Sequence, residues 1–118
     1  MKKMYHLANC TTCQAIIKET KADETDMVFQ DIKTQKITAN QLDEMKKWAG
    51  SYETLFSRRA IKYKELGLKN KQLTEQDYRN YILDEYTFLK RPVTILGNRI
   101  FIGNDKKTVQ QLKEALNS

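Results

Sequence analysis

The sequence predicts an α/β protein whose mixed four-stranded sheet is interrupted by a helical insert. Two observations predict this class. The chain opens with a strand–helix–strand order, which implies a parallel strand pair joined by a right-handed crossover. It closes with two strand candidates around Gly97-Asn98, a two-residue signal for an antiparallel hairpin, and then a final helix. Because 118 residues suffice for one hydrophobic core, we expect one domain.

The first third of the chain predicts two strands with a helix between them. Residues 4–7 are the first strand candidate, and residues 10–13 form a polar loop. The helix begins with "QAIIKE", in which Ile16 and Ile17 form the apolar side. After a polar connection, residues 27–32 alternate between apolar and polar types and predict the second strand.

Helical signals fill the middle of the chain. Two capping signatures mark helix starts, each a threonine followed three residues later by a side chain that can reach back: Thr38 with Gln41, and Thr74 with Asp77. Residues 51–67 predict one or two short helices between these two. The helix that starts at Thr74 is expected to continue until Pro92 ends it.

The last third of the chain returns to strands. Residues 93–96 and 99–102 are the two strands of the hairpin, and apolar residues at helical spacing line the last helix. We therefore expect about residues 1–37 and 91–118 to form the α/β core, with the helical insert at about residues 38–90.

The formal net charge of +6 is concentrated in the insert. From Arg58 to Lys71 six basic side chains stand against one acid, Glu65, and a field of that sign favours anionic ligands or acidic partners. Acidic residues are interspersed among the other basic residues and no nucleic-acid-binding motif is present, so we expect no direct nucleic-acid contact. No apolar run approaches the ~18 residues of a membrane span, and the N-terminus lacks the apolar region of a signal peptide. We expect a cytoplasmic protein with no membrane contact.

The stretch that carries chemistry is "NCTTCQ", which holds both cysteines of the chain, Cys10 and Cys13. Because Cys10 follows a strand and precedes a helix, we expect it at the carboxyl edge of the sheet, beside amides that lack helical partners. Those amides and the helix dipole favour the Cys10 thiolate. The same amides, with Asn9, Thr11 and Thr12, predict a place for an oxyanion. Cys13 is expected close enough to attack an adduct on Cys10.

Three interpretations of the cysteine pair compete. A redox or nucleophilic pair fits the position between loop and helix best. The second is half of a zinc site, but structural zinc uses four protein ligands, and this chain adds only one histidine, His6, to its two cysteines. The third is a pair of small packed thiols without further function. We expect His6 to be a strand residue on a sheet face and not a catalytic base.

The segments "NCTTCQAIIKE", "KYKELGL", "LKRPV" and "FIGN" together resemble the arsenate reductase (ArsC) family and its Spx-type relatives over nearly the whole chain. The resemblance implies a thioredoxin-like fold in which Cys10 is the nucleophile, Arg91 helps to bind the oxyanion and Pro92 follows a cis peptide bond. It also implies an anion-binding arginine in the insert, at Arg58 or Arg59, of which Arg59 fits the Spx-type pattern better.

Two departures from the arsenate reductase pattern bear on function. Glutaredoxin-coupled arsenate reductases have a third arginine in the last strand, where this chain has Ile102. Their loop also lacks the second cysteine, which here is Cys13 and makes the loop similar to that of Spx-type proteins. Both departures favour reversible disulfide chemistry over an arsenate-specific reaction.

Two functions follow as hypotheses. The first is a thiol-dependent oxidoreductase of the arsenate reductase type, in which Cys10 attacks a small oxyanion or thiol substrate and Cys13 or an external thiol resolves the adduct. We expect no bound cofactor and no metal, with glutathione or glutaredoxin as electron donor. The alternative is an Spx-like transcriptional regulator that binds RNA polymerase and uses the Cys10–Cys13 disulfide as a switch. Gly50 lies near the place of a glycine used in that contact.

Overall fold

The computed structural model describes residues 1–117, which form two compact units. One unit combines residues 1–35 with the chain from Arg91 onward, and the other consists of residues 36–90. The unit boundaries differ by two residues or fewer from those expected for core and insert; that the two units act as one domain stays a prediction. Among the described residues, every helix is too short or too polar to cross a membrane.

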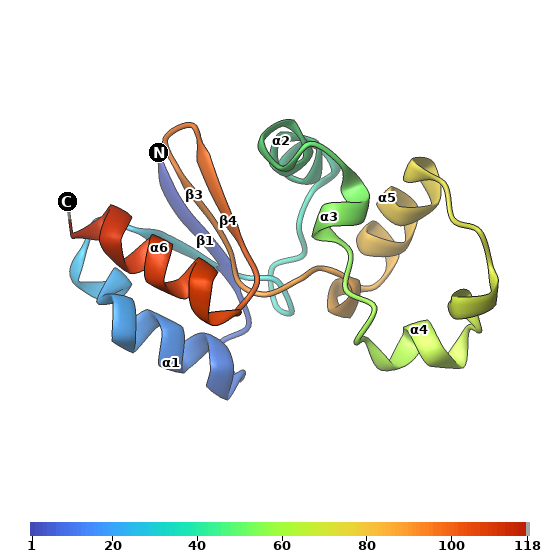
Figure 1. Cartoon of the computed structure of the whole chain (residues 1–118), viewed down its shortest axis with the longest axis horizontal. Helices are drawn as coiled ribbons and strands as arrows, with labels where there is room; N and C mark the ends of the chain where they lie inside the picture. Colours follow the sequence, from blue (N-terminus) through green and yellow to red (C-terminus); the bar gives the residue numbers. More distant parts are fainter. Residues whose placement is uncertain (118) are drawn as a thin grey trace. The chain divides into compact units, whose positions relative to one another are not determined.

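The first unit contains a sheet in the strand order β2-β1-β3-β4 (Figure 1). Its strands are β1 (Lys2–His6), β2 (Val28–Asp31), β3 (Val93–Leu96) and β4 (Arg99–Ile102). β1 and β2 are parallel, whereas β3 is antiparallel to both β1 and β4. This is the mixed four-stranded sheet that the sequence predicts, and the order of its strands and helices is that of a thioredoxin-like fold.

Two helices, α1 (Thr11–Thr20) and α6 (Lys106–Leu116), lie side by side on one face of the sheet (Figure 1). Met4 of β1 and Phe101 of β4 form a buried core with apolar residues of both helices. Since β3 is antiparallel to both of its neighbours, β1 and β4 run in the same direction. The helices that follow these two strands therefore begin at the same edge of the sheet.

The second unit is helical. Its elements are α2 (Ala39–Ala49), α3 (Tyr52–Leu55), α4 (Ile61–Glu65), the 3-10 helix η2 (Leu68–Asn70), α5 (Glu75–Asp84) and the 3-10 helix η3 (Tyr86–Phe88). Both predicted capping boxes are confirmed, because the Thr38 and Thr74 hydroxyls accept the N3 amides and the N3 side chains accept the N-cap amides.

Polar contacts join α5 to α2 and α3 within this unit. The Arg79 guanidinium donates to the two carboxylate oxygens of Asp43 at 2.9 and 3.2 Å, and the Tyr52 hydroxyl donates to Asp43 at 2.6 Å. The Glu75 carboxylate accepts the amides of Tyr52 and Glu53, the first two of α3, at 2.8 and 3.1 Å. A bidentate arginine pair holds two helices at a fixed distance, so the insert carries its own stabilising contacts.

Two predicted boundaries are wrong. The first helix begins at Thr11, directly after Cys10, so the loop is shorter than expected and Cys13 is a helical residue. The helix predicted from Thr74 to Pro92 ends at Asp84 and gives way to η3. Here Glu85 is extended and its carboxylate accepts the amide and hydroxyl of Thr87, which favours a new turn over a continued helix.

Candidate redox site at Cys10 and Cys13

The loop between β1 and α1 holds Cys10 directly before the first residue of the helix. Cys10 is the N-cap residue, with the extended backbone typical of that position. Its amide donates to the Leu7 carbonyl at 3.1 Å, and its carbonyl accepts the Gln14 amide at 3.0 Å. The Gln14 side chain also donates to the Ala8 carbonyl at 2.6 Å. These bonds fix the loop on both sides of the sulfur.

The two thiols differ in exposure although they belong to one helical turn. Both are free cysteines. Cys10 is half-buried at the end of the helix, whereas Cys13 is 1% exposed and lies on the buried side of α1, as does Ile16. Cys10 is therefore the sulfur that a substrate can reach first.

The surroundings of Cys10 favour its thiolate. Partial burial acts to raise the pKa of Cys10, but the amide and thiol of Cys13, the amide of Thr12 and the charge of Arg91 together outweigh it and lower the pKa. The Cys10 side chain does not accept a capping hydrogen bond from an amide of the first turn of α1. The stabilisation therefore combines the electrostatic effect of unpaired amides at the start of a helix with the contributions of the Cys13 thiol and the Arg91 charge.

The surroundings of Cys13 favour its neutral thiol. Burial, together with the negative charge of Cys10 beside it, raises the pKa of Cys13 to about 11. At neutral pH the site therefore holds one sulfur poised as a nucleophile and a second that keeps its proton.

Arg91 and Pro92 lie at the edge of the sheet where β1 ends. Val93, the first residue of β3, is paired with Tyr5 near the end of β1, and the Cys10 loop follows directly. The Arg91–Pro92 peptide bond is cis, as the resemblance implied. The Pro92 carbonyl accepts the Gly103 amide at 2.9 Å, which joins this segment to the end of β4. The Arg91 charge is thereby held where it acts on both thiols.

The oxyanion candidates of the loop are accessible. Asn9, Thr11 and Thr12 are exposed, and none of them makes a side-chain hydrogen bond within residues 1–117. At the same edge of the sheet, apolar Ile102 is paired with Val93. An anion at this edge would meet one guanidinium of this unit, that of Arg91.

The two arginines of the insert belong to the second unit and differ in their contacts. The Arg58 guanidinium donates to Glu53 at 2.8 Å and to the Tyr78 hydroxyl at 3.0 Å. Arg59 is exposed, and the structure records no ion pair for its side chain among the described residues. Of the two candidates, Arg59 is the one whose guanidinium is not already occupied.

His6 is the last residue of β1, as predicted for a strand position. Its ring packs edge-on against Phe29 at 5.5 Å, and its Nδ1 atom is buried without a hydrogen-bond partner. Burial lowers the pKa of His6 against the opposing charge of Asp31. Within residues 1–117, no three His, Cys, Asp or Glu side chains are grouped as metal ligands, so the zinc interpretation gains no support.

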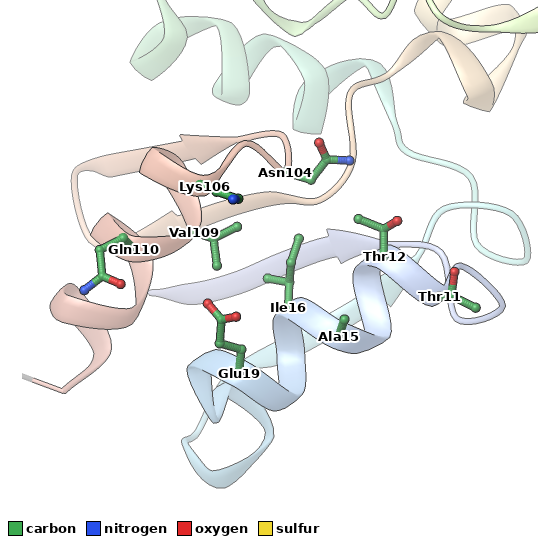
Figure 2. A pocket seen from close by; sticks show the side chains of 9 residues that line it. All are labelled: Thr11, Thr12, Ala15, Ile16, Glu19, Asn104, Lys106, Val109 and Gln110. Carbon is green, nitrogen blue, oxygen red and sulfur yellow. The ribbon is translucent and has the colours of Figure 1, made fainter.

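Sequence reasoning missed the groove beside this site. It lies between α1 and α6 and combines Thr11 and Thr12 with residues about 95 positions later, such as Asn104 and Lys106 (Figure 2). Each helix alone predicts an exposed polar face. The groove follows only from the fact that both helices begin at the same edge of the sheet.

The fold and the site define a thioredoxin-like protein with a dithiol at the start of its first helix and a cis-proline beside it. A sequence model of the ArsC family matches residues 5–112, so the chain belongs to the ArsC family. No curated protein matches the chain by sequence.

Solved structures are similar over nearly the whole chain. A Staphylococcus aureus protein solved by NMR in solution is 27% identical with a TM-score of 0.75, over 94% of this chain and 97% of that one. An arsenate reductase from Vibrio cholerae is 14% identical with a TM-score of 0.77, over 96% and 95%. An arsenate reductase (ArsC) related protein from Brucella melitensis is 20% identical with a TM-score of 0.70, over 93% and 92%. The last two similarities concern the fold alone.

Proposed function

We propose that this protein is a thiol-dependent reductase that transfers two electrons from the Cys10–Cys13 dithiol to a disulfide substrate. Membership of the ArsC family supports a thiol-dependent reductase. The single observation that carries the proposal is that the pKa values of the two neighbouring thiols are shifted in opposite directions, lowered at half-buried Cys10 and raised to about 11 at buried Cys13. A nucleophile and a resolving thiol need this difference.

The first step is attack by the Cys10 thiolate on one sulfur of the substrate disulfide. A new S–S bond forms at Cys10, and the substrate's other sulfur leaves as a thiolate and takes a proton from solvent. The substrate is then half reduced and covalently attached. The amides of Cys13 and Thr12 and the Arg91 charge lower the pKa of the attacking sulfur and so raise its thiolate fraction.

The second step is attack by Cys13 on the Cys10 sulfur. Once Cys10 is in a mixed disulfide it is neutral, so one cause of the raised pKa of Cys13 disappears. Cys13 can then lose its proton more easily, form the Cys10–Cys13 disulfide and release the substrate's second thiol. We propose that an external thiol, glutathione or glutaredoxin, returns the pair to the dithiol.

A disulfide fits this site better than arsenate. A tetrahedral oxyanion is held best by several cations and bidentate donors, but Arg91 is the one guanidinium whose charge acts on Cys10, and the chain has apolar Ile102 where the resemblance places another arginine of arsenate reductases. Thr11, Thr12 and Asn9 add polar groups without charge. We therefore propose a disulfide as the substrate, and arsenate serves as the comparison in the test.

The test compares the wild-type protein with Cys10→Ser and Cys13→Ser. Each is fully reduced, freed of reductant and mixed with hydroxyethyl disulfide, or is given arsenate with glutathione and glutaredoxin, and the rate of product formation is measured together with the intact mass. We expect disulfide reduction by the wild type, none by Cys10→Ser, and a trapped mixed disulfide in Cys13→Ser. If Cys10→Ser reduces the disulfide as fast as the wild type, the proposal is wrong. Faster turnover of arsenate than of the disulfide would reassign the substrate.

A second candidate function is the Spx-like switch, and buried Cys13 is the observation in its favour, because a second thiol permits a reversible intramolecular disulfide. Gly50 gives it little support, since its positive φ of 94° is explained by its place at the end of α2. Co-purification with RNA polymerase from reduced cells, lost after oxidation and retained in Cys13→Ser, would favour the switch over the enzyme.

A further inference from the structure

We infer that Gln14 is a positioning residue of the proposed reaction, because its side chain fixes the turn from which Cys10 attacks. This inference rests on the proposed function. The side-chain amide of Gln14 donates to the Ala8 carbonyl at 2.6 Å, and its backbone amide donates to the Cys10 carbonyl at 3.0 Å. One helical residue therefore holds the chain both before the reactive cysteine and at it.

The turn before Cys10 is exposed at its centre. The Cys10 amide donates to the Leu7 carbonyl at 3.1 Å, which closes a β-turn with Ala8 and Asn9 as its central residues. Leu7 is buried, but Ala8 and Asn9 are exposed, and the Asn9 side chain makes no hydrogen bond in the described part of the chain. Packing therefore does not fix the peptide bond between Ala8 and Asn9, whereas the hydrogen bond from Gln14 does.

The two common β-turns differ in the orientation of this central peptide. In a type I turn both central residues have negative φ, whereas in a type II turn the peptide is rotated by about 180° and the second central residue has positive φ. Lys21 is the one non-glycine residue with positive φ in the described part of the chain, so Asn9 has a negative φ and the turn is not of type II. Asparagine adopts positive φ more readily than most residues, so the sequence permits both turns. The bond from Gln14 to the Ala8 carbonyl selects the observed orientation.

The orientation of the turn bears on both thiols. Rotation of the central peptide changes ψ of Ala8 and φ of Asn9, the backbone torsions just before Cys10. At the other end of the turn, the Leu7 backbone forms a hydrogen bond with the Cys13 sulfur and acts to lower its pKa. The turn therefore begins at a residue bound to the resolving thiol and ends at the nucleophile. A rotated peptide displaces Cys10 from the amides that stabilise its thiolate and changes the approach of Cys13.

The test measures attack and resolution separately. Dipyridyl disulfide is symmetric, so attack by the Cys10 thiolate on either sulfur releases one pyridine-2-thione, whose absorbance gives the rate, and leaves the other pyridyl sulfur bonded to Cys10. Attack by Cys13 on the Cys10 sulfur then releases the second pyridine-2-thione. The protein is fully reduced, freed of reductant and kept in excess over the probe. The pH profile of the first release gives the pKa of Cys10.

The main variant is Gln14→Met, which keeps the size of the side chain and removes its hydrogen-bond donor. Gln76→Met is the matched control, because the Gln76 side chain is also exposed on a helix and donates one hydrogen bond, to Asn80 at 2.9 Å, but belongs to the second unit. We expect Gln14→Met to slow the first release about two- to fivefold, within the range for one hydrogen bond, and to move its profile to higher pH. Gln76→Met should leave the rate and the profile at their wild-type values.

Substitution of Asn9 tests whether Gln14 acts through the turn. Glycine adopts positive φ freely, whereas alanine disfavours it by a factor of roughly 5 to 30. The effect of Gln14→Met should therefore rise to about tenfold in an Asn9→Gly background and fall below about twofold in an Asn9→Ala background. Each factor is a ratio of two rates in the same background, so any contribution of the Asn9 side chain itself to the reaction cancels.

A wild-type rate and pH profile in Gln14→Met would overturn the inference. So would the same factor in all three backgrounds, because Gln14 then acts on Cys10 without the turn. Both outcomes leave the proposed function intact if the wild type releases both equivalents of pyridine-2-thione. If the wild type releases only the first equivalent, the dithiol reductase is wrong, while the profile of that release still decides the role of Gln14. No release by the wild type rejects both proposals.

Discussion

The starts of α1 and α6 have the same place in the fold but different chemistry. Both helices follow parallel strands and begin at one edge of the sheet. At α6, the Asp105 carboxylate accepts the amide of Thr108 at 3.2 Å and its hydroxyl at 2.6 Å, so the helix start is capped by its own side chain. At α1, the N-cap is Cys10, which makes no side-chain cap bond. The unpaired amides of α1 therefore remain available to stabilise a thiolate.

This comparison separates structural from reactive helix starts. Asp105, Thr38 and Thr74 are strong capping residues, and each satisfies amides of its own helix. Cysteine is a weak acceptor and leaves them unsatisfied. The stability that α1 forgoes is the condition for the reactivity of Cys10, a trade-off typical of functional sites.

The largest expected effect comes from giving α1 the cap of α6. Cys10→Asp places a carboxylate where it can accept the Cys13 amide, and it removes the nucleophile. We expect disulfide exchange to be lost entirely, and the free energy of unfolding to exceed that of Cys10→Ala by about 0.5–2 kcal/mol. Activity assays and urea unfolding of both variants measure this. Equal stability of the two variants would mean that the amides of α1 are not available.

A smaller effect is expected at α6. Asp105→Ala should lower the thermal midpoint by several degrees at neutral pH without slowing Cys10. Hydrogen bonds from the side chain and amide of Thr108 lower the pKa of Asp105, so the stability it contributes is present above pH 3.8 and is lost as the pH falls through the lowered pKa. When thermal unfolding is measured across pH, the midpoints of the wild type and of Asp105→Ala should become equal in acid. A constant difference down to the lowest pH would contradict the carboxylate cap.

The smallest effects concern the titration of Cys10. The rate of iodoacetamide labelling should rise with pH around a pKa below that of free cysteine. Cys13→Ala removes a thiol that stabilises the thiolate and should shift the profile to higher pH, and Arg91→Met should shift it less, since the Arg91 charge is the weakest of these contributions. If the pH profile of labelling is the same in both variants as in the wild type, the helix amides alone lower the pKa of Cys10.

The sequence predicted local features such as capping boxes and turns better than the residues at which helices begin and end. Both capping boxes and the Gly97-Asn98 hairpin depend on residues close together in the chain, and the structure confirms them. The first helix was expected to start after Cys13, because loop residues and N-terminal helix residues share the same polar types. The helix from Thr74 was expected to reach Pro92, yet it stops at Asp84 because the Glu85 carboxylate favours a new turn.

By itself the sequence determined that two thiols lie at the junction of a strand and a helix, since alternation, spacing and capping are short-range properties. It could not distinguish the two sulfurs. Only packing against the sheet buries Cys13 and leaves Cys10 accessible, and only the order of the strands brings Asn104 and Lys106 into one groove with Thr11 and Thr12. Burial and proximity arise from contacts between distant segments, and these determine the protonation of the two thiols.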